Sequence, residues 1–527
     1  MTKMKQTPLT MDSIKPLITA LIPKQVIDEA CEWAIMHGVA FKQADNTARH
    51  CPFSIAPTTM QRSTYQHLRH VTPLIAKLIS NVSEDHAFLQ QSLATMAQAD
   101  PFFGLLMKLH IQLHGHLYKH HQEQHHPKVS DGALFAPRQP LLLMRTDFMD
   151  DRHQGAKVIE FNGIAAGMAP FGQRATQLHQ FIAEQWGEAI QSWVVDPKAI
   201  PADNVGMEQL ALAIATAARE VRDNFLGDDA AESNKPTFLM VVQPDEDNVY
   251  DQHLLEVALQ NLGVRTVRRT FAQLSGQLST QINSDDTQNG ANKPRLMLEG
   301  VGAIDSVYLR AGYQYQDYCA PELKEQECCY TLSQTRVFIE QHYVAVNATV
   351  SQQLATSKSM QMLFTMMSAE QYTRWGLSLE EARLVKSVLA EMKPITTESI
   401  EWFNTHANQQ EWVLKNQGEG GGHCIFAAEI SAKLATLNVE EYDAWALMQR
   451  LYPHERETPT VAVRDSKATL VTDLVSEIGL FTAHYQGQPV TDFDGYAGYL
   501  IRSKPASENE GGIHSGQGIL DSLALID

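Results

Sequence analysis

The sequence lacks the two glycine-rich words that most often mark a nucleotide site. It contains no G-x-x-x-x-G-K-[ST] segment, which excludes a P-loop enzyme. It also contains no G-x-G-x-x-G that follows a strand and opens a helix. These absences narrow the class of nucleotide site without identifying it.

Cysteine is scarce, and no two cysteines form a C-x-x-C pair. The 527 residues contain six: Cys31, Cys51, Cys319, Cys328, Cys329 and Cys424. Cys328 and Cys329 are adjacent, which disfavours a simple bridge between them. A long chain with so few cysteines predicts a reduced, cytoplasmic protein.

Long apolar runs and excess positive charge are also missing. No run reaches the roughly 18 apolar residues of a membrane span, and the apolar piece at residues 16–23 is short and bounded by prolines, unlike a secretory signal. The formal net charge of −19 argues against nucleic acid or an anionic membrane as a partner. With 44% hydrophobic and 20% charged residues, the chain has the composition of a globular protein with about three or four domain-sized units.

The most informative segment that is present is Trp412–His423, WVLKNQGEGGGH. A strand-like run ends at Lys415, and three glycines, Gly420–Gly422, predict a mobile loop with accessible backbone N–H groups. Such groups suit phosphate oxygens, with Lys415 as a fixed cation and Glu419 as an oxygen ligand for Mg²⁺. A flexible surface turn is the alternative for the glycines alone.

Residues 141–148 and 158–164 are strand-like and flank a polar stretch, which predicts a hairpin. Residues two apart share a strand face, so Glu160 and Asn162 form a plausible platform for a divalent cation. A charged pair on a solvated sheet face is the alternative. Arg145 and Asp147 share a face for the same reason, and the small residues of Gly163–Gly167 allow a ligand to approach the backbone.

The remaining periodicities divide the chain into three parts. Helical spacing at residues 14–39, 65–93, 101–118 and 181–225 predicts a mostly helical first part. Alternating strand and helix patterns predict a parallel-sheet domain at 236–355, with an exposed loop at 275–293. Further on we predict helices at 360–405, interrupted at Pro394, and at 439–449, then strands at 460–463, 468–471, 480–485 and 499–504. A second glycine-rich loop, 510–518, follows Arg502 and Lys504.

Histidine is concentrated between His110 and His126. The pairs His110/His114, His116/His120 and His121/His125 are each one helical turn apart, so a metal site is geometrically possible. A solvated, polar helix end is the alternative, because no other ligand type is clustered there.

Cations and Mg²⁺ ligands on strands and mobile loops favour ATP-driven chemistry, in which positioning and charge neutralisation move a phosphoryl group. No Ser–His–Asp order or reactive cysteine setting competes with this interpretation. In several short segments the chain resembles the eukaryotic glutathione synthetases of the ATP-grasp superfamily. The similar words, in the order of that family, are MRTDFM (144–149), IEFNGIAA (159–166), DNVYDQ (247–252), VRRTF (267–271), VYLRAGY (307–313), QQLATSKSMQ (352–361), VLKNQGEGGG (413–422), SEIGLF (476–481) and LIRSK followed by EGGI (500–513).

The resemblance implies an α/β (α+β) ATP-grasp fold with a helical N-terminal region and an inserted parallel-sheet substrate domain. The implied parts are residues 1–235, 236–355 and 356–527. It implies a homodimeric ligase that joins γ-glutamylcysteine to glycine through an acyl phosphate, with ATP as co-substrate and two Mg²⁺ ions.

Site residues are implied in the same way. The Mg²⁺ ligands would be Glu160, Asn162 and Glu419, and the catalytic residues Arg502, Lys415 and Lys358. The implied ATP-binding residues are Lys358, Lys415, Gln417, Gly420, Gly421, Gly422, Phe426, Met448, Gln449, Arg450, Leu451, Glu477, Lys504 and Glu510. The implied substrate-binding residues are Arg145, Ala165, Ala166, Gly167, Glu246, Asn248, Gln252, Arg310, Tyr313, Arg502, Ile513 and His514.

Some words depart from the family pattern. His423 and Cys424 replace two asparagines, Phe426 replaces a tyrosine, and Ile513 and His514 replace a Val-Ala pair beside the acceptor. These differences leave two alternatives open: a ligase with another acceptor amine, and a non-catalytic nucleotide- or peptide-binding relative.

Overall fold

The computed structural model describes residues 22–120, 139–225, 235–282, 293–320, 325–418, 424–509, 511–513 and 518–527. For residues 116–120 and 325–330 it describes the backbone only.

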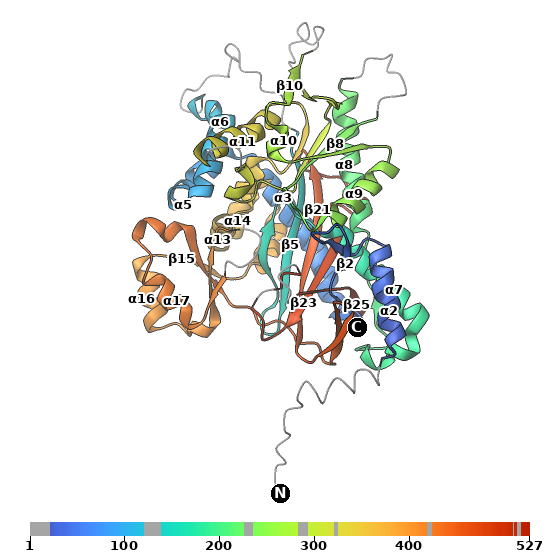
Figure 1. The fold of residues 1–527 in the computed structure, drawn as a ribbon. Helices are drawn as coiled ribbons and strands as arrows, with labels where there is room; N and C mark the ends of the chain where they lie inside the picture. Colours follow the sequence, from blue (N-terminus) through green and yellow to red (C-terminus); the bar gives the residue numbers. More distant parts are fainter. Residues whose placement is uncertain are drawn as a thin grey trace.

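The centre of the molecule is a nine-stranded, largely antiparallel sheet (Figure 1). Its strand order is β20-β19-β3-β24-β23-β21-β5-β6, and β22 also pairs with β21. The bounds are β3 Phe53–Ser54, β5 Leu141–Asp151, β6 Gly155–Asn162, β19 Thr460–Arg464, β20 Lys467–Val471, β21 Leu474–Tyr485, β22 Gln488–Pro489, β23 Tyr496–Pro505 and β24 Ile519–Asp521. The predicted β5–β6 hairpin is confirmed.

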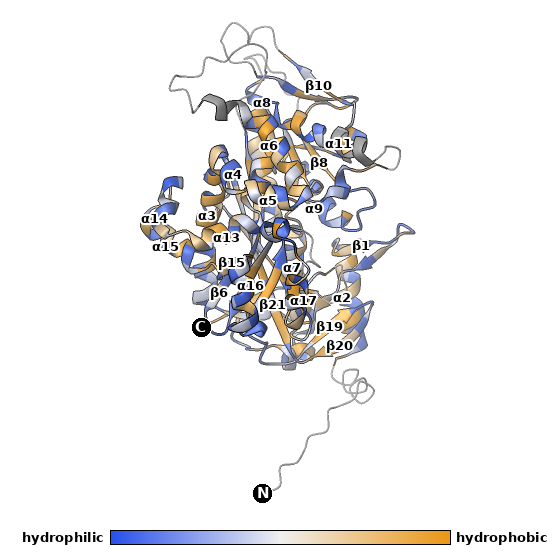
Figure 2. Ribbon diagram, turned by 90° about the vertical axis from the view of Figure 1, so that its left-hand side faces the viewer, coloured by the Kyte–Doolittle hydropathy of each residue, from blue (hydrophilic) through white to orange (hydrophobic). Residues whose placement is uncertain are grey.

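Helices bury both faces of this sheet, and the sequence of β5 reflects that. Leu141 and Leu143 belong to the hydrophobic core on one face, and Leu142 and Met144 to the core on the other. A strand buried on both faces is a continuous apolar run, as seen here. Figure 2 shows the same arrangement, with hydrophobic residues along β21 and hydrophilic ones on the outer helices.

One core packs α2 Lys24–Met36, α7 Ala169–Ile190 and α8 Gly206–Asp223. The other packs α3 Arg62–Ser83, α4 His86–Ser92, α5 Ala94–Ala99, α6 Pro101–His120, α12 Val350–Ala355, α13 Lys358–Met366, α14 Ala369–Tyr372 and α15 Leu379–Ser387. A short 3-10 turn, η1 Gln191–Trp193, follows α7, and another, η3 Thr373–Trp375, follows α14.

A second, four-stranded sheet is parallel throughout, in the order β14-β13-β8-β9. It comprises β8 Thr237–Val241, β9 Arg265–Arg269, β13 Ser306–Leu309 and β14 Ala345–Asn347, with α9 Val249–Asn261, α10 Phe271–Leu274, η2 Tyr315–Tyr318 and α11 Glu325–Glu340. The predicted parallel sheet is therefore confirmed. The loop expected at 275–293 is interrupted by β10 Leu278–Gln281, which joins β11 Arg295–Leu298 and β12 Gly302–Ala303 in a small antiparallel sheet.

A third sheet, in the order β15-β18-β16-β17, forms a lobe with α16 and α17 at the lower left of Figure 1. Its parts are β15 Met392–Pro394, α16 Thr397–Thr405, η4 Gln409–Glu411, β16 Trp412–Asn416, β17 Cys424–Phe426, α17 Ala428–Leu434, η5 Val439–Ala444 and β18 Trp445–Gln449. The helix predicted at 439–449 is wrong: the segment is a 3-10 turn and then a strand, because residues 445–449 pair with β16 and residues 446–448 with β15. Pro394 ends strand β15 and does not break a helix.

The first part of the chain is less purely helical than predicted. β1 Ala40–Lys42 and β2 Ala48–His50 form a hairpin. β4 Thr58–Gln61 joins β25 Leu523–Ile526 and β7 Ile200–Pro201 in a three-stranded sheet, so segments far apart in the sequence form one small sheet. These short strands have too few residues to show a clear alternation in the sequence.

Candidate active site

A network of charged side chains crosses the central sheet from β5 through β21 to β23. Asp147 is completely buried and accepts hydrogen bonds from Arg145 Nε at 2.5 Å and Nη2 at 2.8 Å. The same carboxylate accepts one from Arg502 Nη2 at 2.8 Å, and Arg502 also contacts Glu477. Arg502 and Glu477 face each other in the β21–β23 register. Asp147 thus joins two arginines that lie 357 positions apart in the numbering of the sequence.

Glu160 and Asn162 lie on β6, opposite Asp147 and Arg145 on β5. Asn162 donates its Nδ2 to Asp147 Oδ2 at 3.0 Å, which leaves its amide oxygen available for a ligand. Lys358 Nζ lies 3.8 Å from Glu160 Oε2, and the Glu160 side chain is 26% exposed. The predicted pair therefore lies at the edge of the charged network.

The electrostatic field keeps Glu160 ionised. Burial alone would raise its pKa, but Lys358, Lys415, Arg502 and Arg145 together lower the pKa to about 2. Because the folded pKa lies below the ordinary value of 4.5, the stabilisation from this carboxylate is present above pH 4.5 and is lost as the pH falls toward 2. Burial has the larger effect on Glu477 and raises its pKa, although Arg502 opposes it.

Two lysines connect the lobe of the third sheet to the central sheet. Lys415 on β16 donates to the carbonyl oxygen of Ile159 at 3.1 Å. Lys358, the first residue of α13, donates to the carbonyl oxygen of Gly418 at 2.7 Å. Both ammonium groups therefore lie where the strand before the triple glycine meets the Glu160 strand. Gln417 is buried, and its Oε1 accepts from the Ser359 backbone N–H at 3.0 Å.

The residues present fit a magnesium ion. A carboxylate that stays ionised and the amide oxygen of a side chain whose nitrogen is already hydrogen-bonded, two residues apart on one strand face, are hard oxygen donors of the kind Mg²⁺ prefers. Glu160 and Asn162 are the described residues that could hold it. Glu419, the third predicted ligand, lies outside the described residues, as do Gly420–Gly422, His514 and Glu510.

The residues expected near the adenine lie on β18 and just beyond it. Met448 is buried with Met362, Met392 and the partly buried Leu451 in a small apolar cluster. Phe426, on β17, lies under the Arg450 guanidinium at 5.5 Å from its ring centroid. Glu477 instead lies with Arg502 and Asp147, and a Cβ on Gly511 would lie 3.5 Å from Glu477 Oε2. Lys504 donates to the Asn509 carbonyl oxygen at 2.6 Å, so the second glycine-rich segment begins beside these residues.

The turn after β6 lies between two arginines. The carbonyl oxygen of Gly167 accepts from Arg145 Nη1 at 3.2 Å. A Cβ on Gly167 would lie 2.3 Å from Arg310 Nη2, so only glycine allows this approach. Ala165, with a φ of 51°, and Ala166, whose carbonyl oxygen accepts from Tyr308 Oη at 3.1 Å, complete the turn.

Arg310 follows the C-terminal end of β13 and is held by Asp251 on α9, with Nη1 2.9 Å from Oδ2. Burial alone would lower the pKa of Arg310, but Asp251 and its other neighbours raise it, so the guanidinium remains charged. Asp251 Oδ2 also accepts from the Met168 backbone N–H at 3.0 Å. One buried carboxylate thus fixes the arginine and the turn relative to each other.

Glu246, Asn248 and Gln252 surround the start of α9. Glu246 accepts from Gln252 Nε2 at 3.2 Å. Asn248 is buried, and its Oδ1 has no hydrogen-bond partner within the described part of the chain. Burial, Asp317 and Glu246 raise the pKa of Tyr313 to about 12. The two arginines, the turn and these polar groups all lie near the carboxyl ends of the parallel strands, where ligands bind in open α/β sheets.

Ile513 is buried, 3% exposed, and belongs to the large core beside α2, α7 and α8.

Sequence reasoning missed Asp147 and Asp251 as site residues, although each holds an arginine that it identified. The signal for Asp147 was its shared strand face with Arg145. Asp251 occurs in the DNVYDQ word, but nothing in that word indicates its contact with Arg310.

A family model described as "Eukaryotic glutathione synthase, ATP binding domain" matches residues 22–525. The chain belongs to the eukaryotic glutathione synthase family. It is accordingly a ligase of the glutathione synthase type. Family membership supports a role in glutathione synthesis, with ATP as a substrate.

Relatives of this ligase come from plants, yeast and animals. A chloroplastic glutathione synthetase of Solanum lycopersicum is 27% identical, with 98% of this chain and 87% of the relative aligned. The glutathione synthetase large chain of Schizosaccharomyces pombe is 24% identical over 94% of this chain and 96% of the relative. The human glutathione synthetase is 24% identical over 95% and 96%, respectively.

A solved structure has the same fold. The apo form of a glutathione synthetase-like effector (GSS30) from Globodera pallida superposes with a TM-score of 0.64 at 17% identity, covering 99% of this ligase and 98% of that chain. The α/β fold of the glutathione synthetase type is thereby confirmed. Among the described residues, none of the helices combines the length and apolarity that a membrane crossing needs.

Proposed function

We propose that this ligase joins γ-glutamylcysteine to glycine, with ATP converted to ADP and phosphate and glutathione as the product. The observation that carries the proposal is the convergence of Lys358, Lys415 and Arg502 on Glu160 where the two sheets meet. Of these three cations, the two lysines beside the ionised carboxylate suit a nucleotide triphosphate with its metal ion. Family membership indicates which reaction the ATP drives, namely glutathione synthesis.

The reaction has two steps. A carboxylate oxygen of the cysteinyl residue attacks the γ-phosphorus, the bond to the β,γ-bridging oxygen breaks, and ADP leaves. The acyl phosphate formed is then attacked at its carbonyl carbon by the amine of glycine, which loses a proton as phosphate leaves. Lys358 and Lys415 offset negative charge on the transferred phosphoryl group, and Mg²⁺, when bound by Glu160 and Asn162, would neutralise phosphate charge further.

Arg502 has a separate role in this proposal. Its guanidinium is held by Asp147 and Glu477, so its direction is fixed before substrates bind. A preorganised cation stabilises an oxyanion without reorganising during the reaction. We assign Arg502 to the oxyanion of the tetrahedral species formed when the amine attacks.

The donor peptide would occupy the space beside the Gly167 turn. Arg145 and Arg310 offer charge for its carboxylates, and Asn248 Oδ1, which has no hydrogen-bond partner among the described residues, offers an acceptor for its ammonium group. Glu246, Gln252 and Tyr313 would complete this binding surface. The ATP base would lie against Met448–Leu451, with Phe426 and Gln417 as further contacts and Lys504 reaching the nucleotide.

Gly167→Ala tests the donor site. The new Cβ would lie 2.3 Å from Arg310 Nη2 and displace the guanidinium, so we expect KM for γ-glutamylcysteine to rise about tenfold or more with little change in KM for ATP. The measurement is steady-state kinetics with each substrate varied. Gly187→Ala is the matched control, because a Cβ there meets nothing within 4 Å. An unchanged KM for the peptide would contradict the assignment.

Glu160→Gln tests the metal site. The substitution keeps the shape of the side chain and removes the charge, so we expect the Mg²⁺ concentration for half-maximal activity to rise at least about tenfold. Activity measured against Mg²⁺ at saturating ATP provides the readout. Glu188→Gln, a change elsewhere on the molecule, should leave the Mg²⁺ dependence alone. A Glu160→Gln enzyme with wild-type Mg²⁺ dependence would remove Glu160 from the site.

The identity of the acceptor amine can be tested directly. We propose, from the resemblance to the family pattern, that Ile513 and His514 adjoin the acceptor. Phosphate release should be followed with ATP, Mg²⁺, γ-glutamylcysteine and one of glycine, β-alanine, serine or alanine. Release that is greatest with glycine supports the proposal, and preference for another amine would make this pair the determinant of a different specificity.

We propose, further, that the ligase is a cytoplasmic homodimer. The support is family membership for the dimer and the few cysteines for the compartment. Sedimentation equilibrium of the purified chain tests the first point, and a monomer would contradict it.

A further inference from the structure

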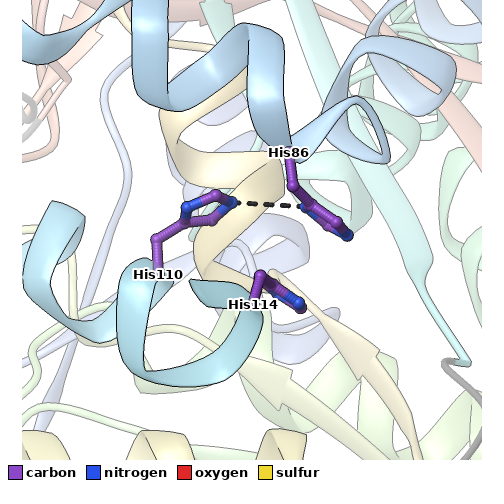
Figure 3. A group of neighbouring side chains, drawn as sticks. All are labelled: His86, His110 and His114. Carbon is purple, nitrogen blue, oxygen red and sulfur yellow. Dashed lines mark hydrogen bonds between the residues drawn. The ribbon is translucent and has the colours of Figure 1, made fainter. Parts of the chain in front are cut away.

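Three histidines from two helices meet away from the charged network described above. His110 and His114 lie one turn apart on α6, and His86 is the first residue of α4 (Figure 3). One ring nitrogen from each lies within 4.8 Å of the others. His110 and His114 are buried, and the His86 side chain is 11% exposed. Of the predicted histidine pairs, the first is therefore completed by a residue 24 positions earlier in the sequence.

The distances are close to those of a metal site. His110 Nε2 lies 3.3 Å from His86 Nδ1. With Zn–N bonds of 2.0–2.1 Å, two tetrahedral ligands lie about 3.3–3.4 Å apart, so this pair already has the required separation. The His86 and His114 rings are stacked, with centroids 3.8 Å apart and planes at 4°. The His114 ring would rotate, moving its nitrogen by at most about 1.5 Å toward the others.

The outer partners of His86 and His110 also match a metal site. His86 Nε2, the nitrogen that does not face His110, lies 3.9 Å from Glu84 Oε2. His110 Nδ1 lies 3.3 Å from the Gln90 side-chain amide. Metal-bound histidines usually present their second nitrogen to a carboxylate or a carbonyl oxygen, which fixes the ring and its tautomer. The hydrogen atom now shared by His86 and His110 would move to His110 Nδ1, and Gln90 would accept it after its amide turns over.

We propose that His86, His110 and His114 bind one divalent cation of the zinc class. Three imidazole nitrogens suit zinc, cobalt, nickel or copper and do not suit Mg²⁺, so the site is chemically distinct from Glu160 and Asn162. A water molecule would supply the fourth ligand. Because the ligands come from α4 and α6, the cation would join the two helices and stabilise the fold.

The test uses the untagged, full-length chain in buffer that contains Mg²⁺. Equilibrium dialysis against Zn²⁺, followed by elemental analysis, gives the stoichiometry and affinity, and Co²⁺ serves as a spectroscopic probe. We expect one equivalent of Zn²⁺, a visible absorption band typical of tetrahedral Co²⁺, and a melting temperature that rises with Zn²⁺. His86→Gln and His110→Gln should each weaken binding by more than about a hundredfold, and Glu84→Gln by about tenfold.

Two controls make the result specific. His70→Gln changes an exposed histidine on α3 and should leave affinity unchanged. The double variant His121→Gln/His125→Gln changes a pair that lies outside the described residues, and it should retain the site. Absence of stoichiometric binding, a His86→Gln protein with wild-type affinity, or loss of binding in the double variant would overturn the proposal. Since the His86 side chain is partly exposed, its variant should fold, which circular dichroism checks.

Discussion

Replacement of Arg502 by alanine is expected to lower kcat by about 10²–10³-fold while the Kd for ATP changes little. Removal of a preorganised hydrogen-bond donor to an oxyanion typically lowers kcat by this amount. Arg502 meets Asp147 and Glu477, and its side chain is 18% exposed, so it is oriented but still reachable by substrate. The measurements are turnover at saturating substrates and ATP affinity by calorimetry.

The control has to separate loss of function from loss of a buried ion pair. Arg295 pairs with Asp305 at 3.3 Å in the parallel-sheet part of the molecule, with a side chain 14% exposed. Arg295→Ala should therefore lower the free energy of unfolding by an amount similar to Arg502→Ala, with little effect on kcat. If Arg502→Ala retained wild-type turnover, or weakened ATP binding as much as turnover, the proposed oxyanion role would be wrong.

Asp147→Asn is expected to cost about 3–5 kcal/mol in the free energy of unfolding. The carboxylate is completely buried and holds both Arg145 and Arg502, so removing its charge leaves two guanidinium groups poorly compensated. Activity should fall as well, because both arginines lose their orientation. Urea denaturation at constant pH gives the stability, and the m value shows whether unfolding remains two-state.

A double-mutant cycle isolates the contact itself. Arg145→Met removes one of the two cations, and combined with Asp147→Asn it should cost clearly less than the sum of the single changes. Asp147→Glu keeps the charge and should be milder than Asp147→Asn. A loss below about 1 kcal/mol for Asp147→Asn would mean that the network contributes little to folding.

Local pattern was sufficient for much of the fold. The β5–β6 hairpin could be predicted because two apolar runs flank a polar turn, and the parallel sheet because strands and helices alternate. The error at 439–449 has a physical cause: Trp445, Leu447 and the residues before them satisfy helical and strand spacing equally well in so short a segment. Pairing with β15 and β16 decides the outcome, and those strands are distant in the sequence.

In the candidate site, too, local sequence indicated some residues and tertiary contacts determine the role of others. Glu160, Asn162 and Lys415 could be proposed as site residues because each lies in a short sequence motif whose residue types suggest metal or phosphate binding. The roles of Asp147 and Asp251 depend on contacts with Arg502 and Arg310, which only the tertiary fold creates. His86 is a further case, because the packing of α4 beside α6 brings it to His110.

We expect this chain to make a peptide bond at the expense of ATP. The most direct test incubates the purified protein with ATP, Mg²⁺, γ-glutamylcysteine and glycine, and identifies the products by mass as phosphate is counted. We predict one glutathione for each ATP consumed, with little phosphate released when the peptide is omitted. Phosphate release without any peptide product, or no ATP consumption with any amine, would contradict the account.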